Sequence, residues 1–322
     1  MMSSAMRILL ILSFLVLSAA SAPAEVSFRQ NDGSIDVLVD GKPFTTFYYG
    51  EKTTKPYFHP LHAADGVVVT RQFPMRDDIP GEAHDHPHHR GLWYSHGNVD
   101  GIDFWANETD QTGGMPKGRI VLKGIHKVGD GFIRGDFEWR GPDGEVMLTE
   151  KRTVWFRGEG KNRIVDFDVT LEAAVKPVKL SDTKEGTFAV RLAPSLRESR
   201  QDRSPGDGVI VNAEGQRGEK LTWGKASPWV DYSGPIGDKN YGVAILDHPE
   251  NPKHPTFWHV RAYGLFAANP FGEHDFFRDK TRDGSITIAP GKSIRFRYRV
   301  VIHPGNAEMA GVAGLYKSWA GR

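Results

Sequence analysis

Short turn-forming clusters recur along this chain and separate stretches rich in β-branched and aromatic residues. Gly129–Gly131, Gly141–Gly144 and Gly158–Gly160 divide one region into four consecutive strand-like segments. In one of them, Arg163–Val169, apolar and polar residues alternate, as expected of a half-buried strand. Helical periodicity is scarce. The pattern therefore predicts an all-β protein built from antiparallel strands.

The expected strands cover most of the chain. They are Ser34–Val39, Phe44–Tyr49, Val67–Val69, Ile120–Lys127, Phe132–Arg140, Val146–Phe156, Arg163–Leu171, Tyr241–Leu246, His259–Phe266 and Ser293–Ile302. The best helix candidate is Ala307–Ala320, whose apolar residues recur at spacings of three and four. Because no Pro/Ser-rich linker divides the chain, we expect one large antiparallel β-sandwich domain over residues 25–322, with a short C-terminal helix. Two smaller β domains, with a break near 172–186, are the alternative.

The N-terminus has the pattern of a secretory signal peptide. Met1–Arg7 carries one positive charge, and Ile8–Leu17 is a short apolar run. Small residues follow, and we expect cleavage after Ala24. The apolar run is shorter than the roughly 20 residues that a spanning helix needs, and no later segment approaches that length. We therefore expect a bacterial periplasmic or secreted protein with no stable membrane insertion. A retained N-terminal anchor is the alternative.

Composition narrows the function classes. The chain has no cysteine, which excludes thiolate nucleophiles, iron–sulfur clusters and Cys-based zinc sites. Its formal net charge is +1, from 41 basic and 40 acidic residues. This balance argues against nucleic acid as a partner. The glycine-rich nucleotide motifs, Gly-x-Ser-x-Gly and His-Glu-x-x-His are also missing from the sequence.

Five of the 13 histidines lie between positions 84 and 96. Pro87 makes a regular central strand unfavourable here, so we expect a loop or strand end. If the segment is extended, His84, His86 and His88 share one face. These imidazoles, with Asp85, are suited to general acid–base chemistry, and the His84–His89 cluster is equally a candidate site for a divalent metal. A solvated polar loop is the alternative.

Further polar and aromatic residues are candidates for the same site. Arg71 follows a β-branched run, and His259 and Arg261, two apart, would point to one face of a strand. The prolines around His259 make its loop rigid. Aromatic residues lie in or beside these polar loops, where they could stack on sugar C–H faces; ordinary core burial is the alternative. The ones that we assign to the site are Trp93 and Trp105.

Several motifs together resemble a known family. They are Pro56–Leu61, Thr70–Met75, Asp85–Trp93, Gly101–Trp105, Trp258–Gly264 and Asn269–Gly272. The combination resembles the bacterial PmoA-like family of unknown function and, more distantly, the galactose-mutarotase-like supersandwich. The latter resemblance implies a concave β face that binds sugars, where a histidine and a carboxylate transfer protons beside an arginine. The family's label alludes to methane oxygenase, but this chain lacks the spanning helices of a membrane copper enzyme.

Together these observations predict an exported carbohydrate-active enzyme of epimerase, lyase or hydrolase type. The residues assigned to proton transfer or its orientation are His86, His88, His89, Asp85 and His259. The residues assigned to substrate binding are Arg71, Arg90, Arg261, Trp93, Trp105 and Asn269. A non-catalytic sugar-binding protein and a metalloenzyme using the histidine cluster are the alternatives.

Overall fold

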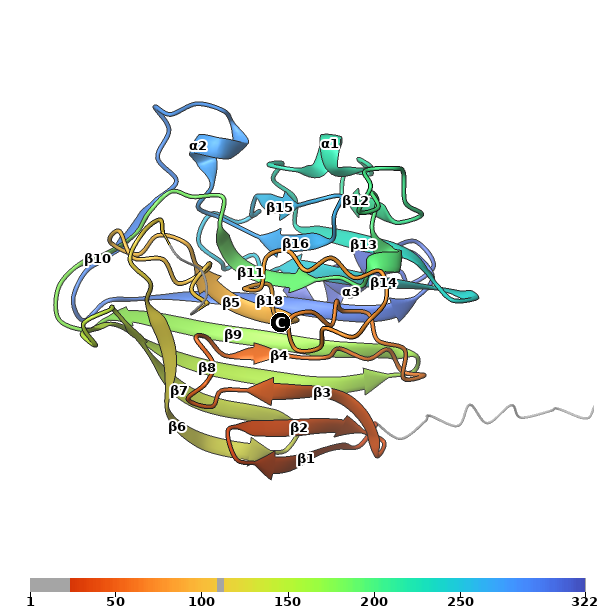
Figure 1. The fold of residues 1–322 in the computed structure, drawn as a ribbon, viewed down its shortest axis with the longest axis horizontal. Helices are drawn as coiled ribbons and strands as arrows, with labels where there is room; N and C mark the ends of the chain where they lie inside the picture. The colour runs from red at the N-terminus through yellow and green to blue at the C-terminus, as the bar shows by residue number, and fades with distance from the viewer. Residues whose placement is uncertain (1–23, 109–112, 322) are drawn as a thin grey trace, which may run out of the picture.

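The computed structural model describes residues 24–108 and 113–321. The predicted signal peptide thus lies, except for Ala24, outside the described residues. Two eight-stranded sheets dominate the fold, and their strands run across the view in Figure 1. All named strand pairs in them are antiparallel.

The first sheet, called sheet A, consists in spatial order of β1 (Val26–Asn31), β2 (Ser34–Val39), β3 (Lys42–Tyr48), β4 (Tyr57–Phe58), β5 (Leu92–His96), β11 (Gly186–Arg191), β16 (Leu265–Ala268) and β15 (Trp258–Val260). The second, sheet B, consists of β12 (Val209–Asn212), β13 (Trp229–Ile236), β14 (Lys239–Asp247), β18 (Ser293–Pro304), β9 (Asn162–Ala173), β8 (Val146–Glu159), β7 (Phe132–Arg140) and β6 (Arg119–Gly129). The smaller elements are the β10–β17 pair (Val178–Leu180 and Ile286–Ile288), α1 (Glu219–Thr222), α2 (Glu273–Phe276), α3 (Val312–Ala320) and a 3-10 turn, Pro194–Leu196.

The core forms where the two sheets face each other. Phe47 and Phe58 of sheet A meet Phe137 and Phe167 of sheet B, with ring centroids 6.2 Å apart in each pair. All four rings are at most 1% exposed. Burying a side chain of this size contributes roughly 1.5–3 kcal/mol, so the alternating apolar residues of the strands account for the sandwich.

One ion pair lies inside this core. Arg152 and Glu150, on the inner face of β8, are 2% and 1% exposed, and Arg152 Nε lies 2.5 Å from Glu150 Oε1. The Arg152 guanidinium sits over the rings of Phe137 and Phe167. Trp139 donates a hydrogen bond to Glu150 Oε2 at 2.7 Å. Because both charged groups are withdrawn from water, removing either one would leave the other as an unpaired buried charge.

The all-β prediction, with large antiparallel sheets and a short C-terminal helix, is confirmed. Three expected elements differ in detail. The single strand His259–Phe266 is instead a hairpin, β15 and β16, that turns at 261–264, where Gly264 has φ +92°. Val67–Val69 contributes only an isolated bridge at Val68. The C-terminal helix starts later than expected, at Val312, since the preceding Gly311 adopts φ +64°.

Helix α3 covers part of the outer face of sheet B. Its Val312 and Trp319 pack in one apolar cluster with Trp229 and Ile164 of that sheet. No helix within the described part of the chain is long and apolar enough to cross a membrane.

Candidate active site

The outer face of sheet A carries a row of cross-strand neighbours. Tyr57, Trp93, Ala189, Ala267 and His259 are successive register partners on β4, β5, β11, β16 and β15. The two alanines leave little side-chain volume at the centre of the row, with larger rings on either side. Loops around residues 71–90 and 103–108 lie over this face and bring the histidine cluster onto it.

Asp85 is held in place by two buried arginines. Its Oδ1 accepts hydrogen bonds from Arg71 Nη1 at 2.6 Å and from Arg191 Nη2 at 3.0 Å. Both arginines are fully buried, whereas the Asp85 side chain is 43% exposed. Burial raises the pKa of Asp85, but the hydrogen bond to His86 and the charges of Arg191, His86 and Arg71 outweigh burial and lower this pKa well below its usual range. Asp85 is therefore a carboxylate at neutral pH.

His86 is paired with this carboxylate and stacked between two rings. Its Nδ1 lies 3.0 Å from Asp85 Oδ2. Its ring is nearly parallel to those of Tyr263 (centroid distance 5.6 Å, 11°) and His89 (4.8 Å, 9°). His89 stacks in turn on Trp93 at 5.3 Å. These four rings form a column above sheet A, which we call the ring column.

The backbone of His86 is unusual as well. Its φ is +46°, in the left-handed region that non-glycine residues rarely occupy. Arg71 Nη2 holds this conformation by donating to the His86 carbonyl at 2.8 Å. Strained backbone of this kind is concentrated at functional sites. The segment is a loop, as expected, so the condition under which His84, His86 and His88 would share one face is not met.

His88 and His89 are buried and neutral. Burial lowers the pKa of His88 to about 2, with the positive charge of Lys55 as the next cause. Burial also places the pKa of His89 well below its usual range. Because Arg191 Nη1 lies 3.0 Å from His89 Nδ1 and can only donate, this nitrogen accepts and the ring proton is on Nε2. That Nε2 has no hydrogen-bond partner among the residues that the structure describes.

A second charged group lies beside Tyr57. Arg90 binds Glu108 through two hydrogen bonds of 2.9 and 2.8 Å, and its guanidinium lies over the Tyr57 ring. The fully buried Lys55 donates to the carbonyl of Trp105 at 2.9 Å and lies 3.6 Å from Glu108 Oε1. Burial lowers the pKa of Lys55 to about 8, against the opposing attraction of Glu108.

His259 and Arg261 approach the ring column from the β15–β16 hairpin. His259 is 2% exposed and accepts a hydrogen bond from Trp223 Nε1 at 2.9 Å. Burial lowers its pKa to about 3. Arg261 lies in the turn, so alternation along a strand does not place it beside His259. Its guanidinium lies over Tyr263, and its Nε is 2.9 Å from Glu219 Oε1.

Some expected substrate contacts have other roles. Trp93 and Trp105 are fully buried and pack on each other at 5.0 Å, so neither is open for a sugar to stack on. Arg71 is also fully buried, and its guanidinium holds the 83–89 loop. Asn269 binds the backbone of Thr183 and Phe271. We therefore do not carry these four residues forward as ligand contacts.

The metal interpretation gains no support from the described residues, since no group of three or more His, Cys, Asp or Glu among them is placed to hold an ion. His84 diverges from the rest of the cluster and stacks on Phe73, with centroids 4.6 Å apart.

Sequence reasoning missed Arg191, Tyr263, Lys55 and Glu108. Tyr263 stood two residues from the predicted Arg261 and could have been included as an aromatic in the same polar segment. Arg191 ends an otherwise apolar strand, where an isolated arginine indicates a buried partner. Neither Lys55 nor Glu108 had a local signal, because their pairing joins segments 53 residues apart.

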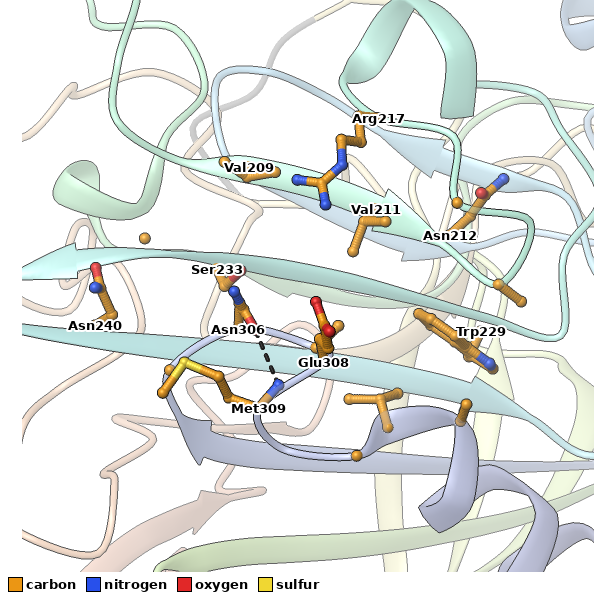
Figure 2. A pocket seen from close by; sticks show the side chains of 18 of the residues that line it. Val209, Val211, Asn212, Arg217, Trp229, Ser233, Asn240, Asn306, Glu308 and Met309 are labelled. Atoms are coloured by element: carbon orange, nitrogen blue, oxygen red, sulfur yellow. Dashed lines mark hydrogen bonds between the residues drawn. The ribbon is translucent and has the colours of Figure 1, made fainter.

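A separate pocket lies over the edge of sheet B. It is formed by β12, β13 and the turn before α3, and its lining includes Trp229, Arg217, Asn306, Glu308 and Met309 (Figure 2). None of the sequence-predicted site residues lines it. The ring column and this pocket are thus distinct places on the molecule.

Solved structures with some similarity to this chain include carbohydrate enzymes. An α-galactosidase from Lactobacillus brevis is 11% identical, with TM-score 0.39, covering 88% of this chain and 39% of its own. A GH36 α-galactosidase from Geobacillus stearothermophilus is 9% identical, with TM-score 0.40 and coverages of 88% and 41%. A galactose mutarotase related enzyme from Lactobacillus acidophilus is 10% identical, with TM-score 0.34 and coverages of 87% and 97%. We draw neither substrate nor mechanism from likenesses this low.

The chain spans about two fifths of the length of the two glycosidases. No curated protein sequence matches it. The resemblance to a PmoA-like family stays a prediction. Residues 34–317, by contrast, match a family described as of unknown function, DUF6807. The chain therefore belongs to the DUF6807 family.

Proposed function

We propose that this protein is an exported enzyme that performs acid–base chemistry on a carbohydrate, with His86 as the proton-transfer residue. The observation that carries the proposal is the anchoring of His86. Its Nδ1 faces a carboxylate that two fully buried arginines hold in place. A half-exposed imidazole oriented by a fixed carboxylate is the arrangement from which general acids and bases act.

The geometry assigns a role to each ring nitrogen of His86. With Asp85 ionised, Nδ1 carries the proton that Asp85 accepts, so Nε2 is the atom that takes or gives a proton at the substrate. None of the hydrogen bonds among the described residues involves His86 Nε2, and the side chain is 42% exposed. When Nε2 takes a proton, the Asp85 carboxylate stabilises the imidazolium. The flanking rings of Tyr263 and His89 limit rotation of the imidazole.

The surrounding groups suit a polyhydroxylated ligand. His88 and His89, with pKa values lowered by burial, stay neutral beside His86 and add no charge to the site. Arg261 and Tyr263 are partly exposed next to His86 and offer a cation and an aromatic face. Epimerisation, elimination and hydrolysis of a sugar all need proton transfer of this kind, and the reaction within this set is left to experiment.

The decisive experiment measures turnover of a glycoside and glycan panel by the wild type and by His86→Gln. Removing a positioned acid or base costs about 10²- to 10⁴-fold in rate, and we expect a loss in this range, with partial recovery on adding free imidazole to His86→Gly. The matched control is His126→Gln. His126 also pairs with an aspartate, Asp136 at 2.9 Å, but lies on β6 at the far edge of sheet B. Undiminished turnover in His86→Gln would contradict the proposal.

A sugar-binding protein without chemistry is the second candidate, favoured by the buried, neutral histidines. It predicts calorimetric binding of a panel member with no turnover, and the same affinity in His86→Gln as in the wild type.

A further inference from the structure

The buried arginines beside the ring column have few ion-pair partners. Among the described residues, Asp85 is the one carboxylate bonded to Arg71 and Arg191, so a single negative charge faces two buried positive ones. A third guanidinium, Arg197, is 3% exposed and makes no ion pair within residues 24–108 and 113–321. The nearby Glu82 does not pair with it; its oxygens instead accept from the backbone N–H groups of residues 72 and 73 at 2.7–2.9 Å.

The neighbouring group shows the same imbalance. Glu108 is shared by Arg90, which binds it at 2.8 and 2.9 Å, and Lys55, at 3.6 Å. Lys55 is fully buried, and the Arg90 side chain is 26% exposed. Asp85 and Glu108 thus each serve two cations.

Several of these buried donors have no acceptor. Within the described chain, Nε of Arg71, Nε of Arg191, and both Nε and Nη2 of Arg197 are buried without a hydrogen-bond partner. Burying a charge that is neither paired nor hydrogen-bonded is unfavourable by several kcal/mol. An oxyanion would supply both the missing charge and the missing acceptors, and the planar guanidinium fork matches carboxylate and sulfate oxygens.

We propose that the ligand of this site is an acidic sugar, one that carries a carboxylate or a sulfate ester, and that Arg197, whose Nε and Nη2 lack acceptors among the described residues, receives its negative group. This rests on the proposed function in taking the ligand to be a carbohydrate. A Cβ at Gly264 would lie 3.4 Å from Arg197 Cγ, so Arg197 is next to the residue that follows Tyr263, and Tyr263 stacks on His86. The negative group therefore binds beside the proton-transfer residue.

The test is calorimetric binding to the full chain of three matched probes: methyl glucoside, methyl glucuronoside and methyl glucoside 6-sulfate. A second pair, polygalacturonate and its methyl ester, presents one backbone with and without charge. We expect the acidic members to bind at least ten-fold more tightly than their neutral partners. The carboxylate and sulfate arms identify which oxyanion is preferred. Affinity for the acidic probes should fall as salt rises from about 50 to about 500 mM, because salt screens the attraction between the free anion and the protein before the anion is buried.

Variants locate the effect. Arg197→Gln should lose the acidic preference, and Arg197→Lys, which keeps the charge, should retain part of it. The matched control is Arg295→Gln, because Arg295 pairs with Asp168 on the exposed surface of sheet B. If Arg197→Gln does not fold, the preference of the wild type for acidic over neutral probes, and the salt dependence of that preference, still test the inference.

The outcomes separate this inference from the proposed function. Equal or tighter binding of the neutral probes, or no binding by any acidic member, overturns the inference. Binding of acidic probes without turnover of any glycan supports the inference while the enzymatic proposal fails. Turnover restricted to neutral glycans supports the enzymatic proposal and overturns the inference of an acidic ligand.

Discussion

Five of the buried histidines are enough by themselves to make the stability of this protein strongly dependent on pH. They are at most 6% exposed: His59, His88, His89, His96 and His259. Burial lowers the pKa of His59 and His259 to about 3, of His88 to about 2 and of His96 to about 4, and places that of His89 well below its usual range. All five are therefore neutral in the folded protein throughout the mildly acidic range.

The sign follows from proton binding. In the unfolded chain each imidazole has a pKa near 6.5, so below about pH 6.5 the unfolded state binds protons that the folded state does not. The contribution of these neutral rings to stability is fully present above that pH. It is lost progressively as the pH falls, until the pKa values of the folded protein are reached. Between about pH 6.5 and 5.5 each histidine removes about 1 kcal/mol, so the five remove about 5 kcal/mol. This is a large part of the 5–15 kcal/mol typical of a folded domain.

Urea unfolding at a series of pH values from about 7.5 to 5.5 measures this effect. We expect the free energy of unfolding to fall with a slope of at least about four protons in the lower part of the range, because His248, whose pKa burial lowers to about 4, adds to the five. His96→Gln should reduce that slope by about one proton, whatever it does to stability at neutral pH. His84→Gln, which alters an exposed ring, is the control. A slope below one proton in the wild type would refute the claim that these rings are buried and neutral.

Three further predictions concern other parts of the molecule. Arg152→Met should lower the free energy of unfolding by about 3–5 kcal/mol in urea titrations because it leaves Glu150 as an unpaired buried charge, and adding Glu150→Leu should recover most of the loss. Gly91→Ala should lower the free energy of unfolding by about 1–3 kcal/mol, because Gly91 has φ +55° and an added Cβ would lie 2.1 Å from the Phe58 carbonyl oxygen. Gly124→Ala is the control and should change the free energy of unfolding far less, since nothing lies within 4 Å of its added Cβ. Asp85→Asn should lower kcat by about 10²- to 10⁴-fold on any substrate that the wild type turns over, by misorienting His86; an unchanged kcat would remove Asp85 from the mechanism.

The sandwich was predictable because its information is local. Turn clusters separate alternating segments, and β7, β8 and β9 lie where the alternation predicts them. The hairpin after His259 was mistaken for one strand because the residues around Gly264 are apolar on both sides of the turn. A single glycine carries the signal there, through its positive φ.

The candidate site was predictable in part. The density of histidines identified the segment 84–89, and the structure brings it together with Arg71 and the 259–261 segment. The exposure of each side chain was not predictable. Trp93 is covered because a loop layer folds back over sheet A, and Arg191 meets Asp85 across 106 residues of chain. Such contacts depend on the tertiary arrangement and leave no local pattern.

The small side chains of Ala189 and Ala267, between Trp93 and His259, have a consequence for altering this protein. They lie at the middle of sheet A and carry no charge and no hydrogen bond, so exchanging them for valine or leucine would lift the overlying loops without changing any ionisable group. Because the loop over residues 71–90 carries Asp85 and His86, a larger side chain at either alanine would reposition the proposed proton-transfer pair while leaving its chemistry unchanged.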